Sequence, residues 1–258
     1  PEFDLSYIWS AFKKKDQKDN ANYRWLCLLD ILYKFLTSAI IARTLPHIAR
    51  HISKEFFGFL KGVGTPQLNH FLHRLLDYYL FNPHSHLYIF SIDFRKAFDS
   101  VHTSFLREVY RVWGIPDNLS TLLTRLNRST FKVMGTAGRP PSAPYTQHRG
   151  LRTGAPRASI DCLILLAWIM AAANNRVEEV HGPGTLIQEK AALRGFAATY
   201  ADRGNSPSTK LGIGTTRVRA MLEHGRPFGF NPEFGKSAVS HARYMISRRL
   251  ARPHSLPQ

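Results

Sequence analysis

The sequence predicts an α+β fold, and three observations support that prediction. Segments with the apolar spacing of amphipathic helices alternate with short apolar runs typical of buried strands. None of these runs leads into a Gly-x-Gly-x-x-Gly loop, which argues against a dinucleotide-binding sheet. With 258 residues, of which 44% are hydrophobic, the chain can build the core of one large domain or two small ones.

Apolar residues three and four positions apart predict a series of helices. Glycines at 58, 62 and 64 end the first of them, and Gly114 and Pro116 separate the third from the fourth. The run from Cys162 to Ala173 is too short to span a bilayer, so we expect a buried helix and no membrane partner. The predicted helices cover residues 24–53, 66–80, 104–113, 117–127, 158–175 and 217–224.

Strands are predicted where short apolar runs are bounded by turn residues. "HLYIFSIDF" (86–94) is the clearest of them, and it ends in Asp93; residues 129–135 and 193–202 are the others. The stretch 138–157 is rich in Gly, Pro and Arg and is predicted to be loop. Residues 204–207, Gly-Asn-Ser-Pro, argue against a further strand after Asp202.

The formal net charge of +17 identifies nucleic acid as the first candidate partner, ahead of an anionic membrane surface. A solvated basic surface without a partner is the alternative. From residue 203 onward ten Lys and Arg face only two Glu, and Arg139, Arg149, Arg152 and Arg157 form a second basic cluster. We expect these residues to contact phosphates. Residues 1–21, with Lys13-Lys14-Lys15, are predicted to be a polar basic arm, and residues 241–258 a basic tail.

The two cysteines, Cys27 and Cys162, lie far apart in apolar runs, without metal-binding spacing. We expect buried, reduced thiols and therefore a reducing compartment.

Asp93 and Asp202 each follow a strand-like run, and two carboxylates at neighbouring strand ends can share Mg²⁺. On spacing alone, a turn or a helix cap explains such aspartates equally well.

Six blocks in order give these aspartates a context. "IDFRKAFDSV" (92–101) resembles the first metal-binding motif of reverse transcriptases of the non-LTR retrotransposon and group II intron type, and "TYADR" (199–203) resembles their Tyr-Ala-Asp-Asp. "NYRWLCLLDILYKFLTSAIIARTL" (22–45), "FFGFLKGVGT" (56–65), "RGLRTGAPRAS" (149–159) and "GFNPEFGKS" (229–237) resemble other motifs of the family. The resemblance implies the fingers and palm of a right-hand polymerase, with a fingers-like region over 22–90, a palm-like region over 91–240, and an absent or truncated thumb.

The resemblance also implies roles for matching residues. Asp93 and Asp202 would be the metal ligands, and Phe98 would lie under the sugar of an incoming nucleotide. The other implied contacts to nucleotide or template come from Arg24, Lys34, Gly154 and Lys236. Each has an alternative: Phe98 could pack in the core, and the basic residues could be solvated or hold an RNA backbone.

The departures from the family pattern fall on positions that handle metal and nucleotide. Arg203 replaces the last aspartate of Tyr-Ala-Asp-Asp, and a guanidinium there repels Mg²⁺ or pairs with Asp93 or Asp202. Thr153 stands where the family has glutamine, and Trp25 where it has proline. The turn residues after Arg203 also predict that the family's hairpin is lost.

These observations predict a catalytically inactive, reverse-transcriptase-like protein that binds RNA, with no cofactor required. We expect it to be a structural component of a large ribonucleoprotein, among other proteins of that particle, and a mitochondrial ribosome is the favoured example. An active, divergent RNA-directed DNA polymerase of a retroelement, using Mg²⁺, is the second hypothesis. A protein-interaction scaffold without RNA is the third.

Overall fold

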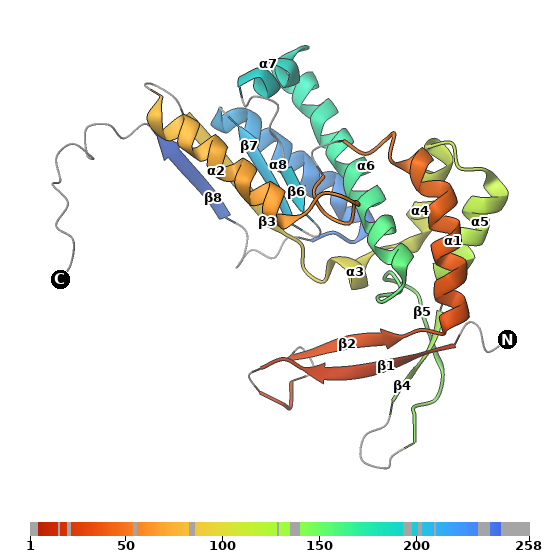
Figure 1. The fold of residues 1–258 in the computed structure, drawn as a ribbon. Coiled ribbons are helices and arrows are strands. Elements are labelled where there is room, and N and C mark those ends of the chain that lie inside the picture. The colour runs from red at the N-terminus through yellow and green to blue at the C-terminus, as the bar shows by residue number, and fades with distance from the viewer. Residues whose placement is uncertain are drawn as a thin grey trace. The chain divides into compact units, whose positions relative to one another are not determined.

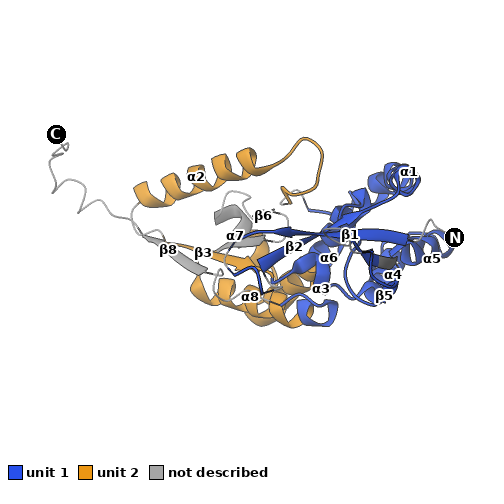
Figure 2. Cartoon of the chain, turned by 90° about the horizontal axis from the view of Figure 1, so that it is seen from below, with its two compact units in different colours: residues 1–53, 95–168, 225–231 blue, residues 54–94, 169–224, 232–258 orange. Residues whose placement is uncertain are grey.

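The structure is a computed structural model that describes residues 5–14, 16–19, 22–53, 56–82, 86–127, 129–134, 140–192, 198–200, 203–208, 210–231 and 238–243 (Figure 1). The chain divides into two compact units (Figure 2). The first unit comprises residues 1–53, 95–168 and 225–231, and the second residues 54–94, 169–224 and 232–258. The two units therefore interleave along the chain, whereas the expected fingers-like and palm-like regions are each continuous.

A four-stranded sheet forms the base of the first unit. Its strands are β1 (Leu5–Phe12), β2 (Tyr23–Leu28), β4 (Ser129–Val133) and β5 (Tyr145–Gln147), in the order β2-β1-β4-β5. β1 runs antiparallel to β2 and parallel to β4. The expectation of a polar arm over residues 1–21 is therefore wrong for β1, because backbone pairing on both edges and the burial of Ser6 and Ile8 hold this segment in the sheet.

The helix predicted over 24–53 begins later than expected. Residues 23–28 pair with β1 instead, and α1 spans Ile31–Ile48. The Asp30 carboxylate accepts a hydrogen bond of 2.7 Å from the backbone N–H of Leu32, which is the role of a helix N-cap. Apolar spacing could not separate strand from helix here, since Leu28 and Leu29 continue the helical pattern backwards across the cap.

The buried stripe of α1 differs from the apolar one. It consists of Tyr33, Thr37, Ile40, Thr44 and Ile48. The two threonine hydroxyls donate to the carbonyls four residues earlier, at 2.8 and 2.9 Å, so their burial leaves no unsatisfied donor.

The other helices of the first unit match their predictions more closely. α4 (Thr103–Val112) and α5 (Asp117–Asn127) confirm the third and fourth predicted helices, and Gly114, at a φ of 78°, ends the first of these. Two short elements, α3 (Ala97–Ser100) and η3 (Arg226–Phe228), were not predicted. The loop expected over 138–157 is wrong at β5 and at the start of α6.

α6 (Pro156–His181) confirms the buried helix predicted around Cys162. Among the described residues it is the one helix long and apolar enough to cross a membrane by length and composition. In the structure 72% of its most apolar window is buried inside the protein, as in the core helix of a soluble domain.

A second four-stranded sheet organises the second unit. Its order is β6 (Ala198–Tyr200), β7 (Arg203–Ser208), β3 (His86–Asp93) and β8 (Ala238–Arg243), with β3 antiparallel to both neighbours. The prediction that the hairpin after residue 202 is lost is wrong, because β7 pairs with β3 along all six of its residues. Pro207 is accommodated within this ladder, where it pairs with Ile89 of β3.

Helices α2 (Thr65–Phe81), α7 (Thr185–Ala192) and α8 (Leu211–Gly225) also belong to the second unit, together with the part of α6 from Ile169 onward. Leu75 and Tyr79 of α2 form a buried cluster with Leu87 of β3. α8 is longer than the predicted 217–224, and its Gly214 lies so close to β3 that a Cβ there would overlap the buried ring of Phe90.

We expect Gly214→Ala to destabilise the protein. Overlap with Phe90 costs about 1–3 kcal/mol, which exceeds the gain of about 1 kcal/mol in helix propensity. Gly212→Ala in the same helix is the matched control, because among the described residues a Cβ there meets the edge of His181 at an ordinary contact distance of 3.8 Å. Urea unfolding of both variants measures the difference. Equal stability of the two would contradict close packing of α8 on β3.

Candidate functional site

Asp93 lies at the end of the central strand of the second unit. Asp93 is 6% exposed, and its Cα is paired with the Cα of Arg203, the first residue of β7. Arg203 is also paired with Tyr200 of β6, so only residues 201 and 202 connect the two strands. The backbone therefore brings Asp93 and Arg203 together at one end of the sheet. Asp202 itself lies outside the described residues.

Among the described residues, Asp93 is the carboxylate at this strand end, and the position paired with it is an arginine in the sequence. Within the described residues, no group of three or more His, Cys, Asp or Glu side chains is arranged to hold a metal ion. A single carboxylate does not concentrate two dications, so a two-metal site here depends on residues beyond those described.

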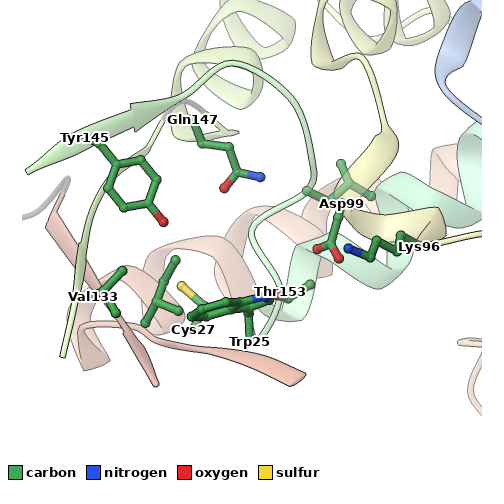
Figure 3. Close-up of a pocket in the computed structure, with 10 residues that line it drawn as sticks. Trp25, Cys27, Lys96, Asp99, Val133, Tyr145, Gln147 and Thr153 are labelled. Carbon is green, nitrogen blue, oxygen red and sulfur yellow. The ribbon is translucent and has the colours of Figure 1, made fainter. Parts of the chain in front are cut away.

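The first unit contains a pocket of about 270 Å³ (Figure 3). Ile8, Trp25, Cys27, Val133 and Tyr145 come from the sheet, with Lys96 and Asp99 at the other end of the pocket. Its lining combines two aromatic rings with hydrogen-bonding groups, which suits a planar polar ligand. The remaining residues of the lining are Gln147, Leu151 and Thr153.

Burial raises the pKa of two acidic groups in this pocket. Partial desolvation raises the pKa of the Asp99 carboxyl, although the residue is exposed, and the positive charges of Lys96 and Lys13 partly offset that rise. Burial likewise raises the pKa of the Cys27 thiol, against the lowering effect of Arg152. The thiol of Cys27 is therefore protonated at neutral pH. The expected burial is confirmed for Cys162, whereas Cys27 is only half-buried.

Trp25 and Thr153, at which the sequence differs from the motifs that it resembles, both line this pocket. Gly154 comes next, at a φ of 91°, and a Cβ there would lie 2.8 Å from the carbonyl oxygen of Cys27. The backbone before α6 thus approaches β2 so closely that only glycine fits.

The remaining predicted site residues have different positions. Arg24, Lys34 and Arg149 are exposed and free to reach a phosphate, and Phe98 is half-buried. Lys236 lies outside the described residues.

Arg152 and Arg157, expected to contact RNA, are instead buried, each with 2% of its surface exposed. The guanidinium of Arg152 stacks 4.2 Å from the centre of the Tyr33 ring and donates to the Ser6 hydroxyl at 2.6 Å. Both guanidinium groups contact partners inside the protein, so the expectation that these two residues contact RNA is wrong.

Arg157 belongs to a buried polar network that joins three helices. Its Nε lies 3.1 Å from Asp161 Oδ2, one turn further along α6, and its Nη1 donates to the Leu123 carbonyl in α5. Its Nη2 donates to the Tyr110 hydroxyl of α4 at 2.9 Å, and that hydroxyl donates to Asp161. Asn127 completes the set with a bond of 3.1 Å to Asp161. The i,i+4 spacing of Arg157 and Asp161 was the sequence signal for this pair.

Comparisons with known proteins show which family the chain resembles. A family model described as "Reverse transcriptase (RNA-dependent DNA polymerase)" matches residues 12–203. No curated protein matches the chain.

Solved structures of telomerase share the fold. Apo telomerase from Candida tropicalis, truncated from its C-terminal domain, superposes with a TM-score of 0.66 at 13% identity, covering 93% of this chain and 51% of that one. Telomerase from Candida albicans in complex with a TWJ fragment of telomeric RNA gives a TM-score of 0.64 at 11% identity, covering 92% and 42%. The chain spans about half or less of the length of these proteins. At such identities the likeness establishes the fold, and it confirms the mixed helix and strand class predicted.

Arg157→Met is expected to lower the free energy of unfolding by about 3–5 kcal/mol, because it leaves Asp161 buried without its counter-ion. Arg176→Met, on the same helix, is the matched control: the side chains of Arg176 and Glu179 are 53% and 63% exposed, and their pair contributes at most about 0.5 kcal/mol. Chemical denaturation measures both. A small change in unfolding free energy for Arg157→Met, together with weakened RNA binding, would show that Arg157 contacts RNA at the surface after all.

Proposed function

Because the chain belongs to the reverse transcriptase (RNA-dependent DNA polymerase) family, matched over residues 12–203, we propose that it retains the family's nucleic-acid-binding framework without polymerase activity. The observation that carries this proposal is the pairing of Asp93 with Arg203 at the strand end.

Electrostatics supports the loss of catalysis. Two-metal catalysis relies on carboxylates that concentrate two dications and neutralise the transferring phosphate. Replacing an aspartate by arginine at a position whose backbone is paired with Asp93 changes the local charge by about two units, which disfavours Mg²⁺ binding there. An arginine at this position therefore disfavours a metal site, and the proposed function requires no cofactor.

The altered pocket supports the same proposal. Trp25 and Thr153 replace residues that the family uses near the nucleotide, and both face the space that the first unit leaves open. A bulky indole in place of proline changes the shape of that space.

RNA is the proposed partner. The charge of +17 exceeds what solubility requires, and phosphate contacts dominate the affinity of such basic proteins. A structurally similar telomerase is bound to a telomeric RNA fragment, which supports an RNA ligand for this fold. We propose structured RNA within a large ribonucleoprotein, with a mitochondrial ribosome as the favoured setting, and descent from an enzyme of the non-LTR or group II intron type.

An active, divergent polymerase is the second candidate, and one observation favours it. The β6–β7 hairpin expected to be lost is present, and residue 202 falls in its two-residue connection. The scaffold that would present a second aspartate near Asp93 is therefore kept.

Primer extension decides between the two. We expect the natural chain not to extend a poly(A)–oligo(dT) duplex with dTTP and Mn²⁺. Its signal should equal that of the Asp93→Ala variant. Arg203→Asp restores a carboxylate, and Arg219→Asp, an exposed site on α8, is the matched charge reversal. Extension by the natural chain that Asp93→Ala abolishes would establish an active polymerase.

Salt dependence tests the RNA-binding half. Arg149→Gln is expected to weaken RNA binding and to reduce the slope of log affinity against log salt by about 1, since it removes one exposed phosphate contact. Its unfolding free energy should change by less than about 0.5 kcal/mol. Exposed Arg107→Gln on α4 is the control for a general loss of charge. An unchanged slope for Arg149→Gln would exclude that contact.

A further inference from the structure

The sheet of the first unit exposes large apolar side chains on the face opposite the pocket. The register pairs Tyr7 with Leu28 and Trp9 with Leu26. All four are exposed, from 38% for Tyr7 to 50% for Leu28. Directly paired residues of antiparallel strands share one face, so these side chains form a continuous surface, which we term the outer face.

The alternation along the strands separates this surface from the pocket. Ile8, which follows Tyr7, pairs with Cys27, and both line the pocket on the other side of the sheet. Antiparallel sheets that cover a core on one side normally present polar residues on the other. An apolar, aromatic outer face therefore indicates a surface with a ligand to bind.

The charges at the edges of the outer face identify the ligand. Arg24 pairs with Ala11 next to Trp9, and Lys132 of β4 pairs with Tyr7. Lys13, Lys14 and Lys18 follow in the β1–β2 connection, where Asp16 and Asp19 are the described acids. None of the described residues paired on the outer face itself is acidic.

We propose that the outer face is a stacking platform for single-stranded RNA. Aromatic side chains that stack bases, together with cations that hold the phosphates, are how proteins bind unpaired strands. Trp9 and Tyr7 lie two residues apart on one strand, about 6.7 Å at the rise of an extended chain, so they can receive two bases of one strand. The cores of protein interfaces, by contrast, are depleted of lysine. This proposal rests on the RNA-binding function and adds the unpaired strand as its ligand.

The test measures the affinity of the full chain for a fluorescent ten-nucleotide oligouridylate and, separately, for a structured hairpin RNA. We expect Trp9→Ala to weaken oligouridylate binding at least fivefold, the lower limit for one stacked base, and to leave hairpin binding within twofold. Trp9→Phe, which keeps a ring, should restore most of the loss. Phe81→Ala, an exposed aromatic at the end of α2 in the other unit, is the matched control. Circular dichroism verifies folding, and Trp9→Leu replaces Trp9→Ala if the latter unfolds.

Unchanged oligouridylate binding in Trp9→Ala or Trp9→Leu overturns the platform even if the hairpin binds tightly. A natural chain that binds the oligomer through Trp9 but not the hairpin supports the platform and contradicts the proposed structured-RNA function. Sedimentation that reveals a dimer of the natural chain, abolished by Trp9→Ala while oligomer affinity is unchanged, assigns the outer face to a second copy of the chain and overturns the RNA proposal.

Discussion

The first unit depends on the ion pair that Arg157 makes with Asp161 in the first turns of α6. Through Tyr110, the Leu123 carbonyl and Asn127, this pair fixes α4 and α5 against the start of α6. Burial raises the pKa of Tyr110 well above its usual range, so its hydroxyl stays neutral and continues to donate. The start of α6 in turn sets the position of Gly154 against β2, and so one wall of the pocket.

The sequence predicted those elements whose residues carry their own periodicity. β3, α2, α4 and α5 were expected where they lie, since each has local apolar spacing and a turn or glycine at its ends. β1, β2 and β7 were missed for a different reason. They form strands because they pair with segments distant in the chain. β1 pairs with β4, more than 100 residues away. β7 pairs with β3 although its residues, which are Arg, Gly, Asn, Ser and Pro, do not favour strands.

The candidate site was predictable in position and less so in chemistry. Asp93 was found because an apolar run ends at it. The resemblance implied a template contact for Gly154, whereas the structure shows its close approach to the backbone of Cys27. Arg152 and Arg157 were misinterpreted because a sequence reveals charge but not burial. The rings that stabilise these two buried guanidinium groups, Tyr33 and Tyr110, are distant in the chain. The outer face escaped notice because its meaning depends on cross-strand register.

β7 also bears on how such a protein can change over time. Its ladder to β3 is made by backbone groups, which every residue type supplies. A strand held in this way places few demands on the identity of its residues. Mutational drift can therefore alter what stands opposite Asp93 without dismantling the sheet, so that the architecture of a polymerase can be inherited independently of its reaction.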